Sequence, residues 1–142
     1  MIRHKKDRGF SLVELLLVLA IIGIISGIAI PAFVSQRRRA RVIGDAQSNA
    51  QVLRMALETY KADSGIYGTA GSTYVWTASG TAPASGIGTA LHFTPKGNSQ
   101  MNYSVAVTGA GLLYTITVTD PTMGGYTVFT TNQNGSGVVT KY

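Results

Sequence analysis

The sequence predicts an α+β fold in which a long N-terminal helix packs against a small antiparallel β-sheet. Two changes of pattern along the chain predict it. An apolar run from Phe10 to Val34 is followed by an apolar stripe at helical spacing from Ile43 to Tyr60. After Gly65 the apolar residues recur at every second position, which is typical of strands. The chain has no cysteine, so packing and sheet hydrogen bonds must hold the C-terminal part together.

The first half of the helix has the composition of a membrane span. Residues 10–34 form a run of about 25 residues, which would be about 37 Å long as an α-helix and would cross a bilayer with some tilt. Glu14 is the charged residue inside this run. Because an ionised side chain in a membrane helix costs on the order of 3 kcal/mol on insertion scales, we expect Glu14 to have a partner and a function.

The helix is expected to continue beyond the membrane as far as Ala62. The stripe on its buried face consists of Ile43, Ala46, Ala50, Leu53, Leu57 and Tyr60. Arg54 and Glu58 lie four residues apart, so they can pair on the exposed side. Gly65 readily takes the left-handed conformation that ends a helix. Together these features predict one helix over residues 10–62, about 80 Å in length.

The weakest part of this helix lies between Gly23 and Pro31. Gly23, Gly27 and Pro31 fall close together, with Ser26 between them. Proline removes a backbone donor and clashes one turn back, and glycine costs about 1 kcal/mol against alanine in a helix. A local loss of helical hydrogen bonding and a simple kink are both consistent with this pattern.

After Gly65 the chain is predicted to form short strands with turns between them. The strands are expected at residues 73–77, 91–94, 103–108, 112–119, 126–131 and 138–142. Short connections imply an antiparallel meander. In residues 112–119 every second residue is apolar, so one face of this strand is expected to be buried; that face consists of Leu112, Tyr114, Ile116 and Val118.

The sequence offers little for catalysis or for metal binding. Beyond His4, the chain has one further histidine, His92, and no acidic pair, phosphate loop or zinc-ligand spacing accompanies it. In the C-terminal loops Asp120, Asn132 and Asn134 supply one carboxylate, which is too little for a calcium site. We therefore expect no enzyme activity, no metal and no cofactor.

The N-terminal motif Arg8-Gly9-Phe10-Ser11-Leu12-Val13-Glu14, with Pro31 further on, resembles the class III signal of type IV prepilins and pseudopilins. The resemblance is close over the first third of the chain. It implies that a membrane peptidase cleaves between Gly9 and Phe10 and that the new amine of Phe10 is methylated. The chain would then consist of a basic leader (residues 1–9), a transmembrane and assembly segment (residues 10–34), and an amphipathic helix with an exterior β-sheet (residues 35–142).

The resemblance further implies a structural filament subunit that polymerises through its N-terminal helices. The precursor would lie in the bacterial inner membrane, and the assembled filament would be extracellular or periplasmic. The expected partners are further copies of the chain, the prepilin peptidase and an inner-membrane assembly platform. Glu14 would act in assembly by pairing with an N-terminal amine, and the segment with Gly23, Gly27 and Pro31 would lose regular helical hydrogen bonding in the filament.

The charge of the chain depends on the leader. The formal net charge is +6, and the leader contributes +3 of it through four basic residues and one aspartate, so cleavage would leave +3. Nucleic acid is therefore not an expected partner. Arg37, Arg38, Arg39 and Arg41 follow the apolar run; they suit lipid headgroups, ion pairs between subunits, or binding to DNA or anionic surfaces.

Two alternatives stay open from the sequence. The first is a pseudopilin of a type II secretion system, because residues 57–67 resemble the helix end of both groups; however, Gly68 stands where pseudopilins often have proline. The second is a minor pilin at the filament tip that binds DNA or a surface.

Overall fold

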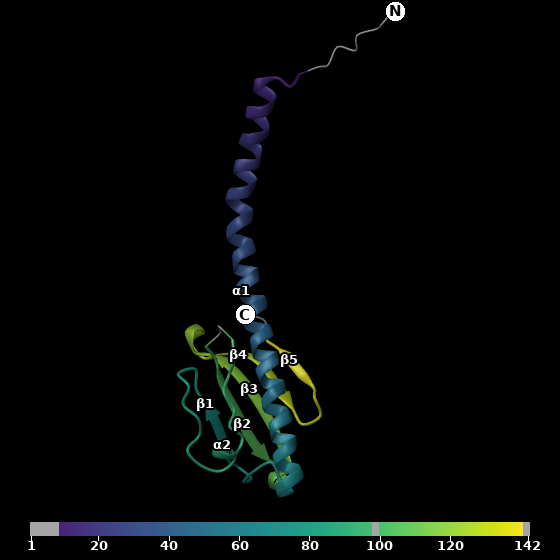
Figure 1. The fold of residues 1–142 in the computed structure, drawn as a ribbon, viewed down its shortest axis with the longest axis vertical. Coiled ribbons are helices and arrows are strands. Elements are labelled where there is room, and N and C mark those ends of the chain that lie inside the picture. The colour runs from purple at the N-terminus through teal and green to yellow at the C-terminus, as the bar shows by residue number, and fades with distance from the viewer. Residues whose placement is uncertain (1–8, 98–99, 141–142) are drawn as a thin grey trace, which may run out of the picture. The chain divides into compact units, whose positions relative to one another are not determined.

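The computed structural model describes residues 9–97 and 100–140 (Figure 1). In chain order the elements are α1 (Leu12–Ser64), β1 (Thr73–Trp76), α2 (Ile87–Ala90), β2 (Asn102–Thr108), η1 (Gly109–Gly111), β3 (Leu113–Asp120), η2 (Pro121–Met123), β4 (Tyr126–Asn132) and β5 (Gly137–Val139). The chain divides into two compact units between Arg38 and Arg39, and each is described by itself.

The N-terminal unit contains the apolar part of α1. One window of 18 residues in this helix has a mean hydropathy of 2.7 and none of it is buried, so the helix is long and apolar enough to cross a membrane. The predicted single helix over residues 10–62 is confirmed, because α1 begins and ends two residues later. Gly65 follows with φ of 82°, and its N–H donates to the carbonyl of Lys61 at 2.8 Å, as expected for a glycine that ends a helix.

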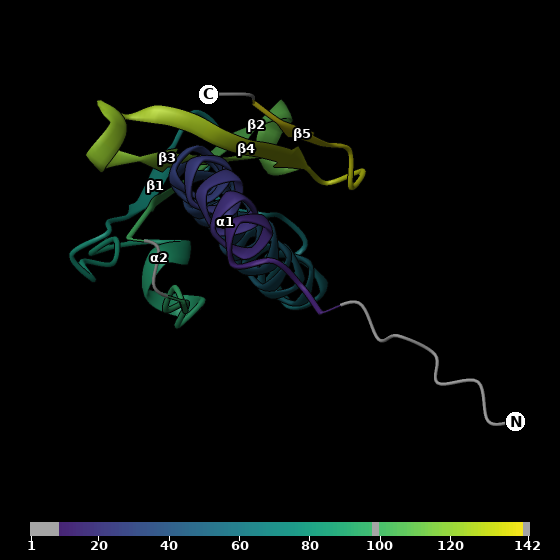
Figure 2. The same cartoon turned by 90° about the horizontal axis from the view of Figure 1, so that it is seen from above.

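The C-terminal unit is built on an antiparallel sheet of five strands in the order β1-β2-β3-β4-β5. Each strand therefore pairs with the next one along the chain, which confirms the predicted meander. Val105 lies opposite Ile116, and Ile116 lies opposite Thr131, so these side chains share one face of the sheet. The C-terminal half of α1 lies along that face (Figures 1 and 2).

The core lies between the second half of α1 and the sheet. Ala46, Ala50, Leu53 and Leu57 of the predicted stripe are completely buried, and Ile43 and Tyr60 are partly buried at its margins. Burial of one leucine contributes about 1.5–3 kcal/mol, so this stripe supplies much of the stability of the unit. The opposing side chains come mainly from β2 and β3; they are Tyr103, Val105, Val107, Tyr114, Ile116 and Val118.

Three strand predictions need correction. Residues 91–94 form no strand, because His92 takes a positive φ of 43° and breaks the extended conformation. Leu112 is 49% exposed, because it closes the turn η1 before β3 begins at Leu113. The last strand ends at Val139 instead of Tyr142, although the N–H of Thr140 still donates to Val128, and residues 141–142 lie outside the described chain.

Candidate functional site

The predicted processing site lies where the described chain begins. Gly9 and Phe10 precede α1, and the side chain of Phe10 is 85% exposed. A Cβ atom at Gly9 would meet no other atom within 4 Å, so the fold does not require glycine at this position. The remainder of the leader, residues 1–8, lies outside the described residues.

Glu14 lies in the first turn of α1, where its carboxylate accepts a hydrogen bond. The donor is the backbone N–H of Ser11, 2.9 Å from Oε2 of Glu14. This contact is one half of a capping box, and a negative charge at a helix N-terminus is also favoured by the helix dipole. The spacing Ser11-x-x-Glu14 is the sequence signal for such a cap, which our sequence analysis missed. Within a single chain the carboxylate therefore has one hydrogen-bond partner, the backbone of Ser11.

Gly23, Gly27 and Pro31 all lie within the continuous helix α1. A Cβ atom added at Gly23 or at Gly27 would meet no other atom within 4 Å. Packing within the described chain therefore does not account for either glycine. In the single chain the two glycines weaken the helix locally. The loss of helical hydrogen bonding in a filament stays a prediction.

Glu58 joins the C-terminal part of α1 to the sheet. Tyr67 donates its hydroxyl to Oε1 and Oε2 of Glu58 at 2.9 and 2.8 Å, and Tyr114 donates to Oε1 at 3.3 Å. The two tyrosine rings pack edge to face with centroids 4.6 Å apart. Glu58 thus has tyrosine partners from the loop after α1 and from β3. The hydrogen bonds of Arg54 go to Gln51 and to the carbonyl of Gln133, so the expected pair of Arg54 with Glu58 is not formed by direct contact.

The environment of Glu58 alters the acidity of both tyrosines. Burial, followed by the hydrogen bond and the negative charge of Glu58, raises the pKa of Tyr67 to about 12, while the charge of Arg54 opposes the shift. Burial and the charge of Glu58 raise the pKa of Tyr114 as well. Both phenols consequently stay neutral at physiological pH, so they serve as hydrogen-bond donors.

Asn49 is a buried polar residue on the same face of α1. Its Nδ2 donates to the carbonyl of Lys96 at 2.6 Å and to the hydroxyl of Tyr103 at 3.0 Å, and its Oδ1 accepts from the N–H of Lys96 at 2.9 Å. Burial raises the pKa of Tyr103 to about 12, against the hydrogen bond from Asn49, which lowers it. The amide holds the segment before β2 against the helix, a structural role that the apolar stripe did not reveal.

The C-terminal loop oxygens that we weighed as calcium ligands stabilise turns. Oδ1 of Asp120 accepts from the N–H and the hydroxyl of Thr122, at 2.8 and 2.6 Å. Oδ1 of Asn132 accepts from the N–H of Asn134 at 3.0 Å. Over residues 9–97 and 100–140, no three His, Cys, Asp or Glu side chains lie close enough together to hold a metal ion.

The N-terminal region of the chain matches a known family model. Residues 4–30 match the family model described as the prokaryotic N-terminal methylation motif. The matched residues include Gly9, Phe10, Glu14, Gly23 and Gly27. The candidate processing site and the charged position in the apolar helix therefore belong to one recognised motif.

Two curated relatives match part of the chain. The type IV major pilin protein PilA of Myxococcus xanthus (strain DK1622) is 37% identical over 64 residues, 45% of this chain and 29% of the relative. Fimbrial protein Q of Moraxella bovis is 39% identical over 54 residues, 36% of this chain and 34% of the relative. The match thus spans about a third of the length of these relatives. No solved structure matches the chain significantly.

Proposed function

We propose that the chain belongs to the type IV pilin family and that it is a structural subunit of a type IV pilus-like filament. Proteins of this family are structural subunits of filaments and not enzymes. Both relatives are named as pilin or fimbrial proteins. The observation that carries the proposal is that the methylation motif, residues 4–30, extends into the unburied apolar part of α1, where Glu14 is the carboxylate.

We propose that the precursor is held in the inner membrane by the apolar part of α1. The prepilin peptidase would cleave between Gly9 and Phe10, which are exposed before the helix begins, and the new amine of Phe10 would be methylated. The exposure of this site supports the proposal, because a side chain at Gly9 would contact nothing within 4 Å and Phe10 is exposed to solvent. An inner-membrane platform would then add the processed subunit to the growing filament.

Glu14 would provide the specificity of this addition. In the single chain its carboxylate caps the helix through Ser11. In an apolar filament interior, the cationic amine of a neighbouring Phe10 is a stronger partner, because attraction between charges is poorly screened there and an unpaired charge costs several kcal/mol. A subunit in the wrong register would leave both charges unpaired, so it would be rejected.

Between the two filament types considered from the sequence, the geometry after α1 favours a pilus. Gly68 has φ of 146°, whereas proline is fixed near −65°. A Cβ atom at Gly68 would also lie 3.2 Å from Ile87. The loop of this chain is therefore built around glycine and does not accommodate the proline that pseudopilins often have there.

Blocking the processing step tests the proposed function. Replacing Gly9 with tryptophan should stop cleavage without disturbing the fold, because position 9 contacts nothing else in the described chain. We expect full-length precursor to accumulate in the inner membrane and surface filaments to disappear. His4→Gln, a change elsewhere in the leader, should leave both normal. Normal filaments built from uncleaved Gly9→Trp chains would overturn the proposal.

A further inference from the structure

Four arginines follow the apolar part of α1 and lie close together along the helix. We call them the arginine collar; they are Arg37, Arg38, Arg39 and Arg41, and all four are exposed. From the first to the last of them the helix rises by about 6 Å, because each residue adds about 1.5 Å. The headgroup region on each side of a bilayer is about 5–8 Å thick, so the arginine collar fits within one such layer.

The arginine collar surrounds more than half of the helix. Successive residues of an α-helix are about 100° apart around its axis, so Arg37, Arg38 and Arg39 together cover about 200°. Arg41 lies about one turn further on, in a direction between Arg37 and Arg38. A DNA duplex or a neighbouring subunit faces a helix from one side. A headgroup layer surrounds a helix that crosses it, so it can reach every member of the collar at once.

The position of the arginine collar along α1 fits the thickness of a bilayer. Residues 15–36 contain no charged side chain, and they would extend about 33 Å as an α-helix. The hydrocarbon core of a bilayer is about 30 Å thick, and none of the most apolar window of α1 is buried in the chain. When this segment spans the core, the collar lies at the headgroups, where long basic side chains place their charge in the polar layer.

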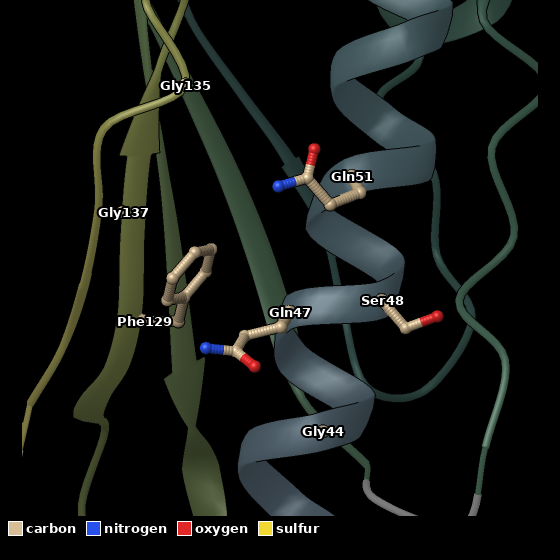
Figure 3. Close-up of a pocket in the computed structure, with 7 residues that line it drawn as sticks. All are labelled: Gly44, Gln47, Ser48, Gln51, Phe129, Gly135 and Gly137. Atoms are coloured by element: carbon tan, nitrogen blue, oxygen red, sulfur yellow. The ribbon is translucent and has the colours of Figure 1, made fainter.

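Two pockets beside α1 in the C-terminal unit have no excess of positive charge. The first is a groove of about 540 Å³ between α1 and the hairpin formed by β4 and β5, where the ring of Phe129 forms the floor (Figure 3). Its lining residues are all uncharged; they are Gly44, Gln47, Ser48, Gln51, Phe129, Gly135 and Gly137. In the second pocket Arg54 is accompanied by the carboxylate of Glu58. Neither pocket therefore concentrates positive charge as the arginine collar does.

A second copy of the chain is poorly matched to the arginine collar. Glu58 accepts hydrogen bonds from Tyr67 and Tyr114, and Asp120 accepts from Thr122, so these two carboxylates serve the fold of the C-terminal unit. Over residues 9–97 and 100–140, no three His, Cys, Asp or Glu side chains lie close enough together to hold a metal ion. The described part of a second copy therefore presents no tight acidic cluster to four arginines.

We infer that the arginine collar binds the phosphate groups of anionic phospholipids, in the leaflet at the C-terminal end of the apolar run. Arginine suits this partner, because its planar guanidinium group forms paired hydrogen bonds with phosphate oxygens. The bound lipids would fix the depth of α1 in the bilayer. This inference rests on the proposed membrane span of α1 and does not depend on polymerisation.

Native mass spectrometry of the full-length chain in a mild detergent tests lipid binding directly. The chain is mixed with equal amounts of phosphatidylglycerol and phosphatidylcholine that carry the same acyl chains, and the bound lipids of each kind are counted. The leader is also basic, so its basic residues are replaced by glutamine in every sample; they are Arg3, Lys5, Lys6 and Arg8. A preference for phosphatidylglycerol then reports on residues 10–142.

Substitutions in the arginine collar should change the lipid preference in proportion to the charge removed. Each arginine near an anionic surface strengthens binding by about fivefold, so the double change Arg37→Gln and Arg38→Gln should reduce the preference by roughly 25-fold. The double change Arg37→Lys and Arg38→Lys keeps the charge and should keep most of the preference. Lys96→Gln is the matched control, since it removes a positive charge from an exposed position of the C-terminal unit, and it should leave the preference unchanged.

Three results would contradict the account in different ways. Equal binding of the two lipids, or an unchanged preference after Arg37→Gln and Arg38→Gln, would overturn the inference and leave the filament function intact. Displacement of phosphatidylglycerol by a short DNA duplex, dependent on the same two arginines, would identify DNA as the partner and would also overturn the inference. Recovery of the unmodified chain from the soluble fraction of cells, and not from membranes or filaments, would instead overturn the proposed function.

Discussion

Two glutamates on the same helix show how the surroundings of a carboxylate decide its role. Glu58 has its partners within the chain, where Tyr67 and Tyr114 donate to it and fix the loop after α1 to β3. Glu14 has one hydrogen-bond partner in the single chain, the backbone N–H of Ser11. The large side chains around it are exposed and apolar. We therefore assign Glu58 to the fold and propose that Glu14 acts in assembly.

The change Glu14→Gln separates charge from capping at this position. Glutamine can still accept the hydrogen bond of a capping box, so the helix start should be preserved while the charge is lost. We expect normal cleavage and normal amounts of mature protein in the membrane, with a sharp fall in sheared filaments. The measurement compares filament yield with total mature protein, and a normal ratio would rule out the docking role of the charge.

The raised pKa values of Tyr67 and Tyr103 predict a loss of stability at alkaline pH. Each folded-state pKa is about 12, above the ordinary value of 10, so the folded state holds these protons more tightly than the unfolded state. The contribution to stability is complete below pH 10 and is lost as the pH rises from 10 through 12. The free energy of unfolding, measured from pH 8 upward, should be level at first and then fall.

Tyr67→Phe supplies the control for this titration. It should cost about 1.5–3 kcal/mol near neutral pH, because the hydrogen bonds to the charged Glu58 are lost. It should also make the decline above pH 10 less steep, because one shifted group is removed. An unchanged slope in the variant would show that Tyr67 does not titrate as the structure indicates.

At the scale of elements, α1 is one helix whose two parts have different environments. In residues 39–64 the stripe with Leu53 and Leu57 is buried, and the periodicity of the sequence was sufficient to predict this. In residues 12–38 the large apolar side chains are exposed in the single chain, as a membrane or a filament interior would require. Sequence periodicity did not reveal the polar contacts of Asn49, because they depend on a segment 47 residues away.

Stiffening the weak segment of α1 tests whether it must lose helical hydrogen bonds during assembly. The double change Gly23→Ala and Gly27→Ala meets no steric obstacle in the described chain and should stabilise the helix by roughly 0.5–1 kcal/mol per site. If the helix must open there, filament yield should fall although the membrane level of the protein is unchanged. Thr59→Ala favours the helix outside this segment, so it should assemble normally. Equal yields from both variants would show that no opening is needed.

At the scale of the whole molecule, local patterns predicted the α+β fold and failed where tertiary contacts decide the backbone. Strands β2, β3 and β4 lie within about a residue of their predicted positions, because alternation and turn residues determine them locally. Residues 91–94 were assigned wrongly as a strand, since Phe93 is buried by edge-to-face packing against Trp76 and Tyr103 and not by strand pairing. The groove beside Phe129 had no sequence signal, because it arises from glycines in β5 and the preceding turn meeting a distant helix.

The N-terminal methylation motif, in contrast, could be recognised from the sequence alone. Residues 8–14 place a glycine, an aromatic residue and a glutamate at fixed spacing, and such a local segment can be recognised without knowledge of tertiary contacts. The structure adds that Gly9 and Phe10 precede α1 and that Glu14 caps it. We therefore propose that this segment is cut and that the remaining chain is built into a filament.

The most direct measurement is the intact mass of this chain recovered from filaments sheared off the cell surface. We predict a chain that begins at Phe10 and carries one additional methyl group, with residues 1–9 missing. The same analysis of the membrane fraction from cells lacking the peptidase should give the full-length chain as its control. Filaments that contain the chain with Met1–Gly9 still attached, or surface filaments that do not contain this chain at all, would contradict the account.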